Sequence, residues 1–199
     1  MSHRVFDISE WQSSGTVQQI VNLGAEGVIL RIGVTYGGVP NLDDKFIEFV
    51  NEVVAAGLPY GIYYYSKMQN YEMAEMEIQW INDRVYELLN GQEPPLGVWL
   101  DMEDEATKFD GVYEIVKWSI NKMKEWGFKK VGIYTGYSYA NSFMDLDDLE
   151  ELQIPMWIAN YDSVNWLKEE HPGLNHVGWQ YTESFEDNIL DCSEWYEDF

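Results

Sequence analysis

Short apolar runs alternate along this chain with stretches whose apolar residues recur at helical spacing, and this alternation limits the folds open to it. Strands that feed helices through short connections form parallel β-α units. Eight mostly apolar strands of this kind favour a closed barrel over an open sheet. The runs with the length and composition of strands are residues 5–8, 28–32, 60–65, 96–100, 131–135, 156–159, 177–181 and 189–190.

The helical stretches have well-marked ends. One-sided apolar stripes lie within residues 46–54, 71–89 and 112–123. Each stripe is followed by a glycine and preceded by a residue suited to an N-cap; the glycines are Gly57, Gly91 and Gly127, and the predicted caps are Asp43, Asn70 and Asp110.

The last part of the chain departs from this regular pattern. Between the final strands, residues 162–170 and 183–188 are too short or too irregular for full crossover helices. We therefore expect an α/β fold: an irregular, TIM-like (β/α) barrel of eight strands whose last strands lack full helical cover. No linker, repeat or low-complexity segment divides the chain, so we expect residues 1–199 to form a single domain.

Charge and cysteine content exclude several classes of partner. The chain has 12 Lys and Arg against 35 Asp and Glu, a net charge of −23, which repels nucleic acid and anionic membrane surfaces. An anionic bacterial wall would not attract it either, so wall targeting would need a separate binding domain, divalent ions or raised salt. Cys192 is the sole cysteine, which excludes an intrachain disulfide and a cysteine zinc cluster. No cofactor is implied.

Asp101 and Glu103 form the chain's most informative chemical pattern. They follow the apolar run 96–100, and side chains two apart on a strand point the same way, about 7 Å apart at their Cα atoms. A pair of carboxyl groups in a cleft is what glycoside hydrolysis requires, one protonated to donate to the leaving oxygen and one ionised. Taken alone, such a pair is more often a solvated acidic loop.

The other strand ends favour the catalytic interpretation. In parallel barrels the functional groups gather at the carboxyl ends of the strands. Nearly all of those ends carry polar or aromatic residues here: Asp7, Arg31, Tyr63, Tyr64, Tyr65, Tyr134, Trp157, Tyr161, Trp179, Gln180, Tyr181 and Asp191. Carboxylates, a guanidinium group and aromatic rings at one rim are typical of a sugar-cleaving cleft.

Six motifs, in order, resemble glycoside hydrolase family 25, the phage-type muramidases, over nearly the whole chain. They lie at residues 6–12 (FDISEWQ), 61–66 (GIYYYS), 100–103 (LDME), 132–135 (GIYT), 157–161 (WIANY) and 178–181 (GWQY). The resemblance implies an irregular (β/α) barrel. It also implies hydrolysis, with retention of configuration, of the β-1,4 bond from N-acetylmuramic acid to N-acetylglucosamine in peptidoglycan.

The resemblance also implies roles for individual residues. Glu103 would be the proton donor, with Asp7, Asp101 and Asp191 as the carboxylates around it. Whether an Asp or the substrate's 2-acetamido group traps the sugar cation stays open. The sugar subsites would be lined by aromatic residues: Tyr63, Tyr65, Tyr134, Trp157, Tyr161 and Trp179. Gln180 and Arg31 would also contact the substrate.

Two positions depart from the family's usual pattern. The family often closes with Asp-x-Asn before an aromatic residue, whereas residues 191–195 read DCSEW, so the Asn is replaced. The second strand often carries Lys where this chain has Arg31, which keeps the charge but turns a point donor into a planar fork. Arg31 would then orient a carboxylate or the substrate.

Three alternatives have specific requirements. A metal-dependent polysaccharide deacetylase needs Asp with paired His, but His3, His171 and His176 lie away from the strand ends. Calcium loops at 101–105 or 145–148 would lack the usual glycine and spacing, so no metal site is expected. The third alternative, an inactive sugar-binding barrel, would have lost the proton donor, and Glu103 is present.

The start of the chain carries no apolar signal region, and no run reaches the roughly 18 apolar residues of a membrane span. We therefore expect the protein to be made in the cytoplasm and to act on the cell wall. It would arrive there as a phage endolysin released through a holin pore, or by secretion if a signal has been trimmed.

Overall fold

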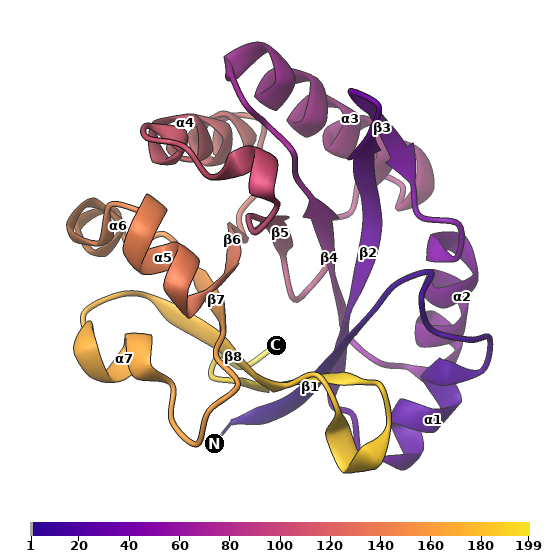
Figure 1. The fold of residues 1–199 in the computed structure, drawn as a ribbon. Helices are drawn as coiled ribbons and strands as arrows, with labels where there is room; N and C mark the ends of the chain where they lie inside the picture. Colours follow the sequence, from indigo (N-terminus) through magenta and orange to yellow (C-terminus); the bar gives the residue numbers. More distant parts are fainter. Residues whose placement is uncertain (1) are drawn as a thin grey trace.

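The structure, a computed structural model, describes residues 2–199 apart from the side chain of residue 187. Strands and helices alternate along most of the chain, and Figure 1 shows the helices outside the strands. The strands are β1 (His3–Ile8), β2 (Gly27–Tyr36), β3 (Val39–Leu42), β4 (Tyr60–Tyr65), β5 (Val98–Asp101), β6 (Val131–Gly136), β7 (Met156–Ala159), β8 (His176–Thr182) and β9 (Asp191–Trp195). The helices are α1 (Thr16–Asn22), α2 (Phe46–Ala56), α3 (Tyr71–Leu88), α4 (Val112–Glu125), α5 (Tyr137–Phe143), α6 (Leu146–Leu152) and α7 (Trp166–Glu170), with short turns η1 (Glu105–Thr107) and η2 (Phe185–Asp187).

The sheet closes into a barrel, which confirms the predicted fold class. The strand order is β1-β9-β8-β7-β6-β5-β4-β2-β3, and an additional pairing of β1 with β2 closes the ring, leaving β3 outside it. The predicted loss of helical cover near the end is also confirmed. Only the five-residue α7 lies between β7 and β8, and only η2 lies between β8 and β9.

Two strands differ from the sequence prediction. β3 forms an antiparallel hairpin with β2 around Gly37 and Gly38, and its sequence, VPNL, is too short and polar to stand out. The final strand begins at Asp191 instead of residue 189, and it runs antiparallel to both β1 and β8. Because no crossover helix separates β8 from β9, the chain turns straight back, and an antiparallel strand results.

Two of the predicted N-caps are wrong. Asn70 does cap α3, since its side chain accepts from the backbone N–H of Met73 at 2.9 Å. The residues preceding α2 and α4 are instead Lys45 and Gly111, neither of which makes a side-chain cap bond. Asp43 lies two residues before Lys45; its Oδ1 accepts the backbone N–H of Lys45 at 2.9 Å, while its Oδ2 forms an ion pair with Arg31.

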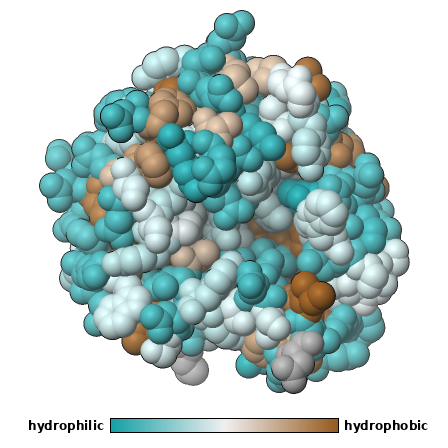
Figure 2. All heavy atoms as spheres, in the orientation of Figure 1, coloured by the Kyte–Doolittle hydropathy of each residue, from teal (hydrophilic) through white to brown (hydrophobic). Residues whose placement is uncertain are grey.

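Apolar residues form two layers. A larger core lies between the strands and the helices, and a smaller one fills the barrel interior. The interior core consists of Val5, Ile29, Leu96, Trp99, Tyr134, Trp157, Val177 and Trp195. On the face seen in Figure 1, hydrophilic residues cover most of the surface and hydrophobic ones appear in small separate groups (Figure 2). Within the described residues, no helix is both long and apolar enough to cross a membrane.

Candidate active site

Strand register directs the predicted polar residues into one end of the barrel. Arg31 of β2 lies opposite Tyr63 of β4, and Asp101 of β5 lies opposite Tyr65 on one side and Tyr134 on the other. Because alternate residues of a strand share a face, these side chains point inward above the apolar interior core. The polar side chains at the carboxyl ends of β2, β4, β5 and β6 therefore form one continuous surface at this end of the barrel.

Asp191 reaches the same rim because its strand is reversed. The first residue of an antiparallel strand lies beside the last residues of its neighbours, and Asp191 pairs directly with Asp7 of β1. The structure therefore brings Asp7, Asp101 and Asp191 together beneath Glu103, which follows β5. Ser193 stands where the family's closing motif usually has Asn. Its hydroxyl accepts a hydrogen bond from the indole N–H of Trp157 at 2.9 Å.

The four carboxyl groups differ in their access to water. Asp7 and Asp101 are buried, at 6% and 3% exposure, and Asp191 is half-buried. Glu103 is exposed and lines a cleft of about 580 Å³ over the ends of β5, β6 and β7. The other residues lining this cleft are Lys108, Gly136, Tyr137, Ser138, Tyr139, Ser142, Phe143, Ala159, Asn160 and Tyr161.

Burial and mutual repulsion raise the pKa of all four groups. Burial is the main cause of the raised pKa of the Asp7 carboxyl, and the charge of Asp191 adds to it. Burial and Glu183 raise the pKa of Asp191 to about 6. Because the two carboxyls lie at paired positions of β1 and β9, the pair holds a proton to higher pH than a free carboxyl does.

Asp101 and Glu103 also hold their protons to higher pH than free carboxyls do. Burial raises the pKa of Asp101, and the charges of Glu103 and Asp7 raise it further, while Arg31 opposes them. Although Glu103 is exposed, the protein around its carboxyl group partly desolvates it, and this is the main cause of its raised pKa. The charges of Asp191 and Asp104 raise the pKa further. Lys108 acts in the opposite direction on Glu103.

Gln180 connects three of the predicted site residues. It is buried on β8, and its Nε2 donates to Asp7 Oδ2 at 2.9 Å. Its Oε1 accepts from the hydroxyls of Tyr134, at 2.8 Å, and Tyr161, at 2.7 Å. A neutral amide can serve a carboxyl and two hydroxyls at once, so Gln180 fixes their relative positions.

Arg31 orients carboxylates beside the site. Its Nε lies 2.7 Å from Asp43 Oδ2 and its Nη2 lies 2.6 Å from Glu10 Oε1. Asp43 also accepts the backbone N–H of Glu10, which ties the segment after β1 to the end of β2. Because both pairs exclude most water, Arg31 is held rigidly next to Asp101.

Three predicted aromatic residues keep positions consistent with lining sugars, and the fourth, Tyr134, supports them from below. Tyr63 is half-buried among the carboxylates, and its pKa is raised by burial and by the charges of Asp7 and Asp101. Tyr65 is half-buried beside Glu103 and Asp104, and Tyr161 lines the cleft wall. Tyr134 is buried beneath them, with its hydroxyl at Gln180.

The prediction that Trp157 and Trp179 line subsites is wrong. Trp157 is 1% exposed, covered by Tyr63, Tyr134 and Trp99 inside the barrel, so it supports the tyrosines from below. Trp179 lies on the outer face of β8, opposite Ile158, with its indole N–H bonded to the carbonyl of Asn160 at 2.8 Å. Only the middle residue of the Trp179-Gln180-Tyr181 run faces inward, and the sequence does not show which face is which.

A buried network behind the site was missed from the sequence. Glu77 of α3 is 0% exposed and accepts from Ser66 Oγ at 2.5 Å, Thr35 Oγ1 at 2.6 Å and the backbone N–H of Lys67 at 3.1 Å. Lys67 in turn lies 3.2 Å from Asp104, the residue after Glu103. The signal was a charged residue on the apolar stripe of its helix, between Ala74 and Ile78.

The histidines lie outside this site. His3 contacts Glu26 and Asp198 near the chain ends, and His176 lies 2.9 Å from the carbonyl of His171. Within the described part of the chain, no three His, Cys, Asp or Glu side chains are grouped so that they could hold a metal ion.

The chain is similar to known proteins in sequence and in structure. The family model "Glycosyl hydrolases family 25" matches residues 6–188, whereas no curated protein matches the sequence. Among solved structures, the spore cortex lytic enzyme SleM from Clostridium perfringens superposes with a TM-score of 0.84 at 20% identity, over 98% of this chain and 67% of that one. The catalytic domain of endolysin ply40 from bacteriophage P40 of Listeria monocytogenes gives 0.77 at 21% identity, over 98% and 94%.

The autolysin LytC from Streptococcus pneumoniae gives a TM-score of 0.80 at 23% identity, over 98% of this chain. The chain spans about half the length of LytC, 47%. At these identities the structural matches show the fold, while the family model covers most of the sequence and includes Asp7, Asp101 and Glu103. The chain belongs to glycosyl hydrolases family 25.

Proposed function

We propose that the protein is a muramidase, or lysozyme, that hydrolyses the β-1,4 bond between N-acetylmuramic acid and N-acetylglucosamine in peptidoglycan. Family membership supports a glycosidase. The similar LytC structure has been solved with a synthetic peptidoglycan ligand, and SleM is described as a spore cortex lytic enzyme. These neighbours support peptidoglycan as the substrate class.

One observation carries the assignment of the proton donor. All four carboxyls have raised pKa values, so pKa alone does not single one out. Glu103 is the one that is exposed and lines the cleft. A general acid must come within hydrogen-bond distance of the oxygen that it protonates, and Glu103 meets this requirement best.

The proposed reaction has two steps. Glu103 donates its proton to the glycosidic oxygen, the bond from that oxygen to the anomeric carbon breaks, and an oxygen nucleophile captures the resulting sugar cation. Glu103, now ionised, takes a proton from water as the water's oxygen attacks the anomeric carbon, which releases the nucleophile. Two displacements at one carbon retain its configuration.

The surroundings of Asp101 favour the substrate's 2-acetamido oxygen as that nucleophile. Asp101 Oδ1 is buried and has no hydrogen-bond partner among the described residues. An unpaired carboxyl oxygen can accept the acetamido N–H and direct the acetamido carbonyl at the anomeric carbon. Asp101 would then act by orienting the substrate. On this proposal, a glycan whose glycosyl unit has been N-deacetylated is not cleaved at that bond.

The experiment compares Glu103→Gln with wild type on purified, insoluble peptidoglycan. The amide keeps the size of the side chain but cannot donate an acidic proton, so we expect the rate to fall about 10²–10⁴-fold. Glu75→Gln, an exposed residue of α3, is the matched control and should leave the rate unchanged. Wild-type activity in Glu103→Gln would exclude Glu103 as the proton donor.

We also propose that the protein acts outside the membrane on the wall, after release through a phage-type pore or by secretion. Its substrate lies there, and the negative charge of −23 gives it little attraction to anionic surfaces on the way. Fractionation of producing cells should find wall-lytic activity outside the membrane; activity confined to intact cytoplasm would contradict this.

A further inference from the structure

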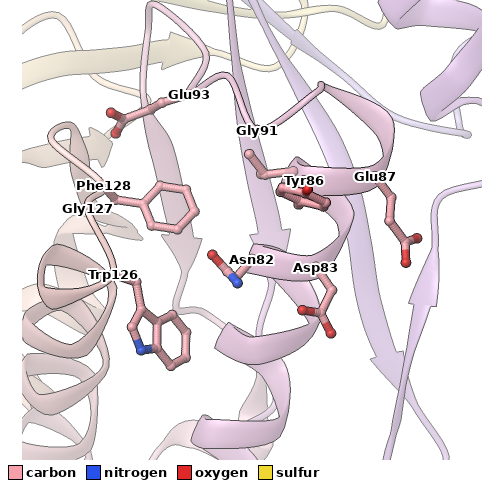
Figure 3. Close-up of a pocket in the computed structure, with 10 residues that line it drawn as sticks. Asn82, Asp83, Tyr86, Glu87, Gly91, Glu93, Trp126, Gly127 and Phe128 are labelled. Carbon is pink, nitrogen blue, oxygen red and sulfur yellow. The ribbon is translucent and has the colours of Figure 1, made fainter.

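A second cavity lies at the end of the barrel away from Glu103. Its walls come from the last turns of α3, the segment before β5, and the loop between α4 and β6 (Figure 3). Elements that lead into parallel strands lie at the amino end of a barrel, whereas Glu103 lies at the carboxyl end. The cavity measures about 320 Å³, enough for a small ligand or one unit of a polymer.

Three aromatic rings line this cavity. Tyr86 of α3 is 75% exposed, Trp126 is half-buried, and Phe128 is buried, at 8% exposure. Figure 3 shows Trp126 and Phe128 on the wall formed by the α4–β6 loop and Tyr86 on the α3 side. An exposed tyrosine facing two other rings leaves apolar surface open to water, which a bound apolar face would cover.

The charged groups of the cavity already have hydrogen-bond or ion-pair partners, whereas its neutral polar groups have none within the part of the chain that the structure describes. Its carboxylates have partners: Glu93 accepts the backbone N–H groups of Lys129 and Lys130, Asp83 accepts from Gln79, and Glu87 pairs with Arg84. In Figure 3, Glu87 and Glu93 point away from the space between the rings, while Asp83 lies at the edge of that space, below Tyr86.

The Asn82 amide, by contrast, extends between α3 and the loop. Asn82 is half-buried and Tyr86 is 75% exposed, so water reaches the amide and the hydroxyl, and neither is hydrogen-bonded to another of the described residues. The cavity therefore offers aromatic faces and unpaired neutral donors and acceptors. The ionic groups around it are already engaged.

We propose that this cavity, lined by Asn82, Tyr86, Trp126 and Phe128, is a second saccharide-binding site that takes an uncharged N-acetylated sugar of a β-1,4-linked glycan. The rings pack against the apolar C–H faces of a pyranose, and the Asn82 amide pairs with a hydroxyl or acetamido group. The surrounding carboxylates disfavour anionic polymers. Its role rests on the proposed function: it would hold the enzyme on an insoluble glycan while the catalytic cleft works at the other end of the barrel.

Binding is tested by NMR titration of the Glu103→Gln protein with chitotetraose, an uncharged β-1,4-linked tetramer of N-acetylglucosamine. The Trp126 indole and Asn82 amide signals report on this cavity and not on the catalytic cleft. We expect saturable shifts of both signals, and Tyr86→Ala to weaken the affinity that they report roughly 3- to 10-fold. No shift at millimolar probe would overturn the proposal.

The matched control is Glu87→Gln, which changes charge at the same helix without removing a ring or the free amide. It should bind the probe as before. If Glu87→Gln weakened binding as much as Tyr86→Ala, the cavity would be recognising charge, and the saccharide assignment would be wrong.

The functional consequence is measured with the active enzyme. Tyr86→Ala and Asn82→Ala should lower the rate on insoluble peptidoglycan several-fold and leave the rate on short soluble fragments unchanged. Equal losses on both substrates would contradict a holding role. If wild type cleaved neither substrate, the proposed function would fail, but the titration would still decide whether the cavity binds sugar.

Discussion

Lys108 shares the cleft with Glu103 and lowers the pKa of its carboxyl. Replacing it by Gln removes a nearby positive charge, so the pKa of Glu103 rises. A proton donor loses activity as the pH climbs above its pKa, so we predict that Lys108→Gln moves the alkaline limb of the kcat profile to higher pH. Lys122→Gln, remote from the cleft, is the control. An unmoved or acid-shifted limb would show that another group sets the profile.

Gln180 is the residue on which the buried polar site depends most. Gln180→Leu would leave Asp7, Tyr134 and Tyr161 without their shared partner. Unpaired buried polar groups cost about 1–3 kcal/mol, and we predict a loss of this size in the free energy of unfolding. Urea denaturation measures it, with Gln79→Leu on the surface of α3 as the control. Equal stabilities would mean that water replaces the amide.

The sequence was sufficient to predict that the acidic residues lie together, but not the orientation and depth of the aromatic residues. Asp7, Asp101 and Glu103 follow strands whose carboxyl ends meet in any such barrel, so their proximity was predictable. Trp157 and Trp179 also lie on strands at this rim, but their roles depend on inward or outward facing and on depth. The pairing of β7 with β8 shifts in register between Met156 and Trp157, which affects the facing of both strands' residues, and nothing in the sequence indicates this shift.

At the scale of elements, β6 must pass very close to its neighbours. A Cβ on Gly132 would lie 2.5 Å from the carbonyl oxygen of Pro155 and 2.7 Å from the Trp99 ring. Gly136, at the end of the same strand, has nothing within 4 Å. We predict that Gly132→Ala destabilises the fold by about 1–3 kcal/mol, while Gly136→Ala changes stability little. Thermal unfolding of both variants checks this; similar melting temperatures would contradict the close approach.

Apolar periodicity was sufficient to predict the parallel strands and the three longest helices, α2, α3 and α4, because each buries one face. It did not indicate the shorter helices α1, α5, α6 and α7. It could not give the direction of β9, which depends on the turn before it. That direction matters for the site, because a parallel strand would place its first residue at the opposite end of the barrel. The family resemblance indicated that Asp191 belongs with the other carboxylates, and the reversed strand explains how it gets there.

At the scale of the whole molecule, the buried acids make stability depend on pH in an unusual direction. Asp7, Asp101, Glu103, Asp191 and Glu77 all have raised pKa values. Such groups bind protons more tightly folded than unfolded, so their stabilisation is present at low pH. It is lost as the pH rises from the ordinary carboxyl pKa near 4 through the folded value, about 6 for Asp191.

We therefore predict that the free energy of unfolding is higher at pH 5 than at pH 7. Urea denaturation at the two pH values measures this. Asp191→Asn should reduce the difference, because the amide does not titrate, while Asp83→Asn on the exposed side of α3 should not. Stability that rises from pH 5 to pH 7 would show that the site carboxyls are ionised at little cost in the folded protein.

The identity of the sugar at the new reducing end distinguishes a muramidase from other enzymes that cleave peptidoglycan. Purified peptidoglycan is digested, the products are reduced with borohydride, and mass spectrometry identifies the terminal sugar alcohol. A muramidase with Glu103 as proton donor gives muramitol-type ends, and Glu103→Gln loses them. Glucosaminitol ends, cleavage within the peptides, or no cleavage by wild type would contradict this assignment.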